Sequence, residues 1–175
     1  IHQNLTSDNV LIRRTPSDAE DVKVLNFGTS PFDINDLDFP VEKAKYLSPE
    51  QCSNTSEIDE RTDIYSLGVI LYEILTGKHP FGFASDARAL VAAYEKGATP
   101  PREVSPACPL LLEDLCLKLM ESDPVKRPKS ADLVAQGVEE FLEGAKEKDR
   151  RRDEALRLCD QAAEPRRRHQ ELEAE

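Results

Sequence analysis

The sequence predicts a mainly α-helical fold with a small β-hairpin near its start. Residues 62–76 form the most apolar stretch of the chain, which is hydrophobic on nearly every side of a helix and ends at Gly77. Helices of this kind are buried and often end at glycine, so we expect a buried central helix here. Residues 109–121 are amphipathic and begin at a proline, and residues 130–142 begin with a serine cap, so both predict helices.

Two short runs rich in β-branched residues, at 9–13 and 22–25, predict the strands of the hairpin. The polar stretch 14–21 between them indicates a loose connecting loop. Residues 26–51 contain one glycine and three prolines and show no sustained period, so we expect one long loop. A shorter helix is expected at 86–96, closed by a glycine.

The composition excludes several classes of protein. The 175 residues are enough for one domain with a real core. A formal net charge of −11 leaves no overall positive field, so we expect no nucleic-acid partner. The four cysteines are spaced neither as zinc ligands nor as a disulfide framework, which indicates a reducing compartment and a cytoplasmic protein. No apolar run approaches the length that spans a bilayer, so no membrane segment is expected.

The composition changes near Phe141. Residues 141–175 contain 9 Lys or Arg and 10 Asp or Glu, with few apolar residues. This segment predicts either a solvent-exposed helix or the start of a broken coiled coil, interrupted at Pro165. The arginine triplets at 150–152 and 166–168 are balanced by neighbouring acids and do not favour a nucleic-acid patch.

Five short motifs follow one another in a fixed order. They are H-Q-N-L-T-S-D-N at 2–9, N-F-G at 26–28, S-P-E at 48–50, D-I-Y-S-L-G at 63–68 and D-P-V-K-R-P at 123–128. This order resembles the signature set of the protein kinase family from its catalytic loop onward, which reads H-R-D-L-x-x-x-x-N, D-F-G, A/S-P-E and a later arginine. Residues 46–51 and 63–81 are especially similar to the bacterial serine/threonine branch of that family.

The resemblance implies the large, C-terminal lobe of a kinase domain. We expect this lobe at 1–142 and a charged helical tail or linker at 143–175. The chain opens inside the catalytic-loop motif, so we expect a fragment from which the small lobe is absent. In the family the small lobe supplies much of the ATP site, so this chain by itself is expected to bind ATP poorly.

Positions that handle phosphate and magnesium in the family are substituted here. Asn4 stands where the catalytic-loop aspartate accepts the proton of the substrate hydroxyl, and a carboxamide takes no proton at neutral pH. Thr6 stands where a lysine steadies the γ-phosphate. Asn26 stands where the aspartate of D-F-G binds Mg²⁺, and its amide oxygen is a weaker ligand for this cation. Asn9 matches the second metal ligand of the family.

Positions that support the fold in the family are retained. The resemblance implies that His2 packs beneath the D-F-G segment and that Asp63 holds the backbone of the catalytic loop. It also implies a buried salt bridge between Glu50 and Arg127. The full set of matching structural positions is His2, Phe27, Gly28, Glu50, Asp63 and Arg127.

This asymmetry favours a catalytically impaired pseudokinase, which serves in signalling as a binding or scaffold module for another protein or a linked domain. The groove between helices 86–96 and 109–121 is a candidate docking surface. The alternative is a serine/threonine protein kinase that transfers the ATP γ-phosphate to protein hydroxyls with weak residual activity, Asp8 or a water standing in for the base. A third hypothesis is a domain fragment with no independent activity. The chemistry at Asn4 and Asn26 discriminates between the first two.

Overall fold

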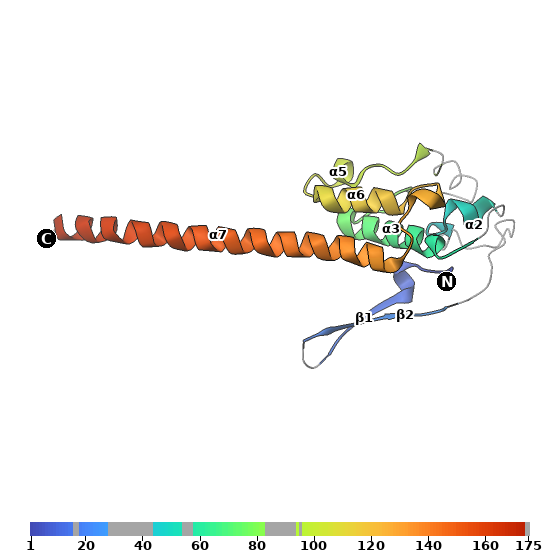
Figure 1. Ribbon diagram of the computed structural model, residues 1–175, viewed down its shortest axis with the longest axis horizontal. Coiled ribbons are helices and arrows are strands. Elements are labelled where there is room, and N and C mark those ends of the chain that lie inside the picture. Colours follow the sequence, from blue (N-terminus) through green and yellow to red (C-terminus); the bar gives the residue numbers. More distant parts are fainter. Residues whose placement is uncertain (16–17, 28–43, 54–57, 83–93, 95, 174–175) are drawn as a thin grey trace. The chain divides into compact units, whose positions relative to one another are not determined.

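The fold is mainly α-helical with one small hairpin, as predicted (Figure 1). It divides into two compact units, Ile1–Ala135 and Gln136–Glu175. The computed structural model describes residues 1–15, 18–27, 44–53, 58–82, 94 and 96–173.

The hairpin consists of strands β1 (Val10–Arg14) and β2 (Glu20–Val24), whose bounds lie within two residues of the predicted ones. The strands pair antiparallel, with Ile12 opposite Val22. These two side chains are 66% and 57% exposed, so the hairpin turns apolar surface toward solvent.

The central helix α3 (Arg61–Thr76) begins one residue before the predicted helix. Its Tyr65 and Tyr72 are each 1% exposed, which places α3 in the middle of the core. The helix ends at Gly77, whose φ of 67° is a left-handed conformation that glycine adopts without steric cost. Near this end Ile74 is 74% exposed, so the helix is not buried on every side.

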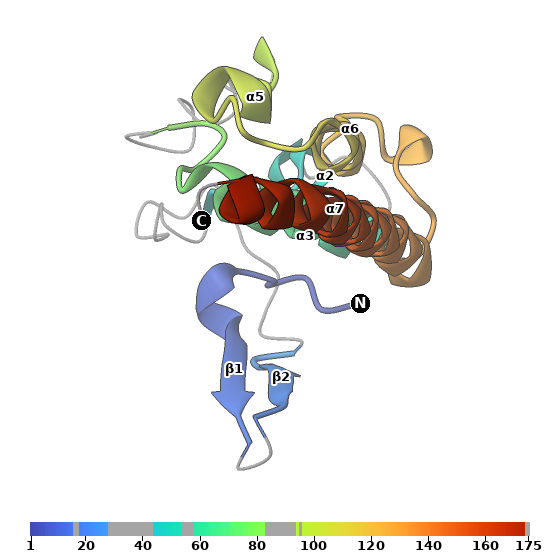
Figure 2. The same cartoon turned by 90° about the vertical axis from the view of Figure 1, so that its left-hand side faces the viewer.

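Helix α6 (Leu110–Leu119) packs closely against α3. A Cβ atom added to Gly68 of α3 would lie 2.7 Å from Cβ of Leu119 and 2.7 Å from Cγ of Met120. The thiol of Cys116 donates to the carbonyl of Gly68 at 3.5 Å. The absence of a side chain at position 68 therefore permits this approach. Figure 2 shows α6 beside α3, with the hairpin extending away from both.

Replacing Gly68 with alanine is expected to lower the free energy of unfolding by about 1–3 kcal/mol, because the added methyl group must displace packed side chains. Urea unfolding followed by circular dichroism measures the change. The matched control is Gly144→Ala in the C-terminal helix, where no atom lies within 4 Å of the added Cβ and alanine is the better helix former. A Gly68→Ala variant as stable as the native chain would contradict the packing described.

The loop predicted over 26–51 ends earlier than expected, because Pro49 begins a short helix; proline is favourable at a first helical position. Residues 28–43 of that loop lie outside the described residues. So does most of the helix expected at 86–96, of which Tyr94 and Lys96 are described and helical. The short elements of the first unit are η1 (Ser7–Asn9), α2 (Pro49–Ser53), α5 (Pro101–Val104) and η2 (Pro124–Lys126).

Helix α7 (Ala131–Glu173) joins the predicted helix 130–142 and the charged segment into one continuous helix. The interruption expected at Pro165 was wrong. A proline inside a helix removes one backbone hydrogen bond, at a cost of about 3 kcal/mol, but alanine, glutamate, arginine and leucine on either side all favour the helix. The boundary between lobe and tail after residue 142 stays a prediction.

In the second unit Leu142, Leu156 and Leu158 are between 47% and 59% exposed, whereas Val138 and Phe141 are partly buried. Glu147 pairs with Arg150 and Arg151, at nitrogen–oxygen distances of 2.9 and 2.7 Å. Such exposed pairs along one helix contribute little to stability, because solvent screens the charges. In the described part of the chain, no helix is both long and apolar enough to cross a membrane.

Candidate functional site

Residues 2–9, called here the catalytic-loop segment, are held by Asp63 in the first turn of α3. The backbone N–H of His2 donates to Oδ2 of Asp63 at 2.6 Å, and that of Gln3 donates to Oδ1 at 2.7 Å. Gln3 has a φ of 62°, which is uncommon for a residue with a side chain. Hydrogen bonds to a carboxylate are strong, so this clamp stabilises the unusual backbone and fixes the start of the segment.

The His2 ring joins the catalytic-loop segment to the residues that follow β2. Its Nδ1 accepts the N–H of Asn4 at 3.2 Å, so Nε2 carries the proton and donates to the carbonyl of Leu25 at 2.8 Å. The ring centres of His2 and Phe27 are 4.4 Å apart. Phe27 is nevertheless 67% exposed, while Gly28 lies outside the described residues. The ring of His2 therefore lies beneath a phenylalanine that remains largely open to solvent.

Hydrogen bonds connect Asn4, Asn9 and Asn26. Nδ2 of Asn9 donates to the backbone carbonyl of Asn4 at 2.7 Å, and Nδ2 of Asn26 donates to Oδ1 of Asn9 at 2.8 Å. Asn4 and Asn9 are 7% and 8% exposed. Next to them, the N–H of Leu25 donates to the backbone carbonyl of Asn9 at 2.8 Å. The structure thus brings together the three asparagines at the predicted base and metal positions.

The donor set around Asn9 and Asn26 does not fit a magnesium ion. Magnesium in proteins is held by one or two carboxylates together with substrate phosphates. Here both side chains are neutral amides, and an N–H group already occupies the oxygen of Asn9. Within the described ranges, no group of three His, Cys, Asp or Glu residues is placed to hold a metal. Thr6, which the resemblance places at the position of the phosphate lysine, is 6% exposed and contributes no charge.

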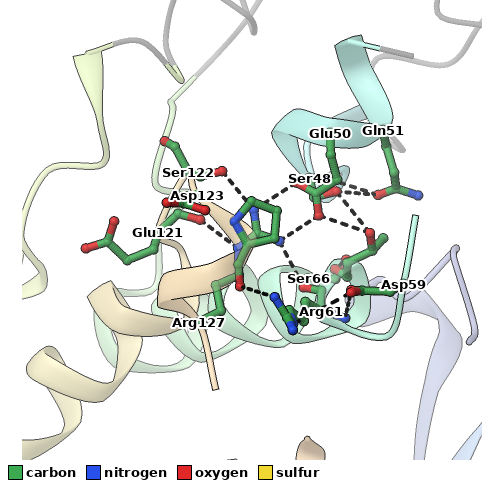
Figure 3. Close-up of polar contacts among 12 residues, drawn as sticks. Ser48, Glu50, Gln51, Asp59, Arg61, Ser66, Glu121, Ser122, Asp123 and Arg127 are labelled. Atoms are coloured by element: carbon green, nitrogen blue, oxygen red, sulfur yellow. Dashed lines mark hydrogen bonds and ion pairs between the residues drawn. The ribbon is translucent and has the colours of Figure 1, made fainter. Parts of the chain in front are cut away.

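Glu50 and Arg127 form a bidentate ion pair in the interior of the first unit (Figure 3). Nη1 of Arg127 lies 2.6 Å from Oε1 of Glu50, and Nη2 lies 2.8 Å from Oε2. The two residues are 5% and 3% exposed. Thr62 of α3 also donates its hydroxyl to Oε1 at 3.0 Å. Burial acts to raise the pKa of Glu50, but the hydrogen bonds and charge of Arg127 outweigh it and the pKa is lowered.

The guanidinium of Arg127 has five N–H groups, and each has an acceptor. Besides the two oxygens of Glu50, the acceptors are backbone carbonyls of Glu121, Arg61 and Ser122, at 2.6, 2.9 and 3.2 Å. The guanidinium carbon also lies 4.9 Å from the centre of the Tyr65 ring. Arg127 therefore joins α2, α3 and the segment after α6.

A second cluster, formed by Ser7, Tyr46 and Glu73, was not predicted from the sequence. The hydroxyl of Tyr46 donates to the carboxylate of Glu73 at 2.9 and 3.0 Å, and accepts from the hydroxyl of Ser7 at 2.8 Å. Desolvation is the main cause that raises the pKa of Tyr46 to about 12, and burial also raises the pKa of Glu73. The one signal in the sequence is that Tyr46 stands two residues before S-P-E.

His79, which the sequence places in an ordinary loop, is packed between two aromatic rings. Its ring centre lies 5.8 Å from that of Tyr46 and 5.9 Å from that of Phe81. The N–H of Phe81 donates to Nδ1 at 3.3 Å, so Nε2 carries the proton and donates to the carbonyl of Lys45 at 3.1 Å. Burial lowers the pKa of His79 to about 4.

The neutral state of His79 predicts a loss of stability in acid. The pKa of this ring is about 4 in the folded chain and 6.5 in the unfolded one. The contribution of the neutral ring to the free energy of unfolding is therefore complete above pH 6.5 and is lost as the pH falls toward 4. The loss is roughly 2 kcal/mol at pH 5. Urea unfolding at pH 7 and pH 5 measures it. In a His79→Gln variant the free energy of unfolding should depend less steeply on pH. A variant with the same pH dependence as the native chain would contradict this role of His79.

The protein kinase domain model matches residues 1–138, and the chain belongs to the protein kinase family.

Bacterial kinases are among its relatives. It is 35% identical over 145 residues to the probable serine/threonine-protein kinase CPE1738 of Clostridium perfringens, covering 81% of this chain and 20% of that protein. It is 35% identical over 146 residues to the tyrosine-protein kinase MasK of Myxococcus xanthus, covering 81% and 22%. Over 134 residues it is 35% identical to the serine/threonine-protein kinase Pkn1 of Myxococcus xanthus, covering 73% and 19%. The chain therefore spans only a fifth or so of the length of these relatives.

Proposed function

We propose that this chain is the large lobe of a pseudokinase, a kinase-family domain that has lost phosphoryl transfer and acts as a binding or scaffold module. The observation that carries the proposal is Asn4, a carboxamide at the position of the general base, on a segment that is otherwise built as a catalytic loop. The partner in this proposal is another protein or a linked domain.

The chemistry of phosphoryl transfer is missing at each substituted position. Asn4 cannot take the proton of a hydroxyl, and the loss of a positioned general base costs about 10²–10⁴-fold in rate. Thr6 supplies no positive charge for the γ-phosphate. Asn26 presents an amide N–H to Asn9 where the family presents a carboxylate to a metal. Kinases of this family use ATP and Mg²⁺, and we propose that this chain binds them weakly.

The framework around these positions is retained. Asp63 clamps the catalytic-loop segment, and Glu50 and Arg127 form their buried ion pair. A buried ion pair is costly to assemble, and breaking one is more costly still. The contacts that support the fold are retained, whereas the groups that would act on phosphate are substituted. This contrast supports a domain that functions through its shape and its surface.

Exposed apolar side chains on and beside the hairpin support a partner of protein nature. They are Leu11, Ile12, Val22, Val24, Leu25 and Phe27, all between 37% and 67% exposed. The groove between residues 86–96 and α6 stays a proposed docking surface, since most of its first wall lies outside the described residues. All four cysteines are free thiols, and three of them are buried, which supports a reducing compartment such as the cytoplasm.

The alternative function is a serine/threonine kinase of weak activity. Asp8 is the carboxylate nearest in sequence to Asn4 and could act as a substitute base. After desolvation, the negative charge of Asp8 is a further contribution to the raised pKa of Tyr46 and of Glu73. Asp8 therefore lies near the cluster that these two residues form with Ser7.

Transfer of labelled γ-phosphate from ATP to a general protein substrate, by the longest form of the protein, tests the proposal. The native protein is expected to transfer no more phosphate than its Asn9→Ala variant. Transfer that is present in the native protein and lost in both Asn9→Ala and Asp8→Asn variants would instead establish the weak kinase.

A further inference from the structure

The side-chain amide of Asn9 can take only one orientation. One of its two polar atoms faces the backbone carbonyl of Asn4, which accepts hydrogen bonds but cannot donate them. The NH₂ group must therefore point to that carbonyl, at 2.7 Å, and the oxygen must point the other way, toward Asn26. That oxygen in turn requires a donor, so Asn26 presents its NH₂ group, at 2.8 Å. One backbone carbonyl thus fixes the orientation of both amides.

An aspartate at position 26 would make this contact unfavourable. A carboxylate has no N–H group, so two acceptor oxygens would face each other across the same short distance. Such a pair needs a cation or a proton between them, and a divalent cation is what the kinase family places there. With asparagine the contact is complete without any ion.

We propose that the hydrogen bond from Asn26 to Asn9 replaces a metal ion as the tie that holds residues 26–27 against the catalytic-loop segment. Asn26 has a φ of 62°, a left-handed conformation that asparagine tolerates better than most residues. The backbone bond from Leu25 to Asn9 lies beside the tie and positions it. His2 completes the attachment through the carbonyl of Leu25. This arrangement of the two segments is independent of divalent cations.

The inference concerns the same site as the proposed function and rests on it for the assignment of Asn26 to the substituted metal position. The two are separable by experiment, because the tie is measured by cation response in the absence of nucleotide. Phosphate transfer by the native protein would overturn the proposed function and leave the tie in place. A response of the native protein to cations at this site would overturn the tie.

The test compares melting temperatures of the whole chain in EDTA and in millimolar MgCl₂ or MnCl₂. The native chain is expected to melt at the same temperature in all three. The Asn26→Asp variant is expected to melt about 2–4 °C lower in EDTA and to regain most of this loss with either cation. The matched control is Gln161→Glu, the same amide-to-acid change at an exposed position of α7, which should show neither effect.

The Asn26→Ala variant separates loss of the hydrogen bond from gain of a charge. It should melt below the native chain and show no recovery with cations. An Asn26→Asp variant that melts like the native chain in EDTA, or that loses stability without recovering it in either cation, would overturn the proposal.

Manganese broadening of NMR signals keeps the proposal testable if a variant does not fold. Mn²⁺ added to the isotope-labelled native chain is expected to leave the side-chain NH₂ signals of Asn9 and Asn26 sharp. Selective broadening of these two signals by sub-millimolar Mn²⁺ would show a metal between the side chains and would contradict the tie.

Discussion

The Arg127→Ala variant is expected to lose about 3–5 kcal/mol of unfolding free energy, the cost of breaking a buried ion pair by removing one partner. The loss arises because Glu50 would keep a charge in the interior without the guanidinium that balances it. The backbone carbonyls of Glu121, Arg61 and Ser122 would each lose the hydrogen bond from Arg127 at the same time. Urea or thermal unfolding followed by circular dichroism measures the change.

Two further variants sharpen this prediction. Arg13→Ala removes an arginine whose side chain is 71% exposed, together with its pair to Asp21, and is expected to cost at most about 1 kcal/mol. Arg127→Lys keeps the positive charge but lacks the planar fork, so it should still lose much of the stability. If Arg127→Ala costs no more than Arg13→Ala, the buried pair does not hold the lobe together.

The second large effect concerns catalysis. In the longest form of the protein, the Asn4→Asp and Asn26→Asp pair of substitutions is expected to raise the rate of phosphate transfer by about 10²–10⁴-fold over the native background. The first substitution restores a group that can accept the hydroxyl proton, and the second restores a charged ligand for Mg²⁺. Steady-state transfer from labelled ATP, in excess Mg²⁺, measures kcat/KM.

Adding Thr6→Lys to this pair should increase the rate further, because the family places a positive charge there on the γ-phosphate. The single Asn26→Asp variant is the control, since it supplies the metal ligand without the base and should remain close to the native rate. A restored protein that stays inactive while folding normally would mean that the defect extends beyond these three positions, and the substitutions at Asn4 and Asn26 would no longer explain the loss.

Local sequence patterns predicted the elements that depend on local physics. The apolar run that forms α3 and the glycine that ends it were both visible in the sequence, because burial and a left-handed end impose residue types directly. The hairpin was also visible, because runs of β-branched residues favour strands, with small errors at its ends. The helix interruption predicted at Pro165 was wrong, because the helical preference of the neighbouring residues outweighed the cost of one proline.

Contacts between distant residues were visible only through the family resemblance, or not at all. The resemblance placed Glu50 near Arg127, 77 residues away, but no periodicity in the chain shows this pair. The contact between Tyr46 and Glu73 and the packing of His79 depend on how the loop before S-P-E meets the end of α3. The orientation of Asn26 toward Asn9 depends on one backbone carbonyl, which a sequence cannot display.

The most direct test of the central claim is nucleotide binding by the longest form of the protein, read as a shift in melting temperature with millimolar ATP, with and without Mg²⁺. A ligand that binds only the folded state must raise its stability. The account predicts no shift that requires Mg²⁺, because the amides of Asn9 and Asn26 bond to each other and offer no carboxylate to the ion. A shift with ATP that appears only when Mg²⁺ is present would contradict it, and would show that these residues still form a metal site.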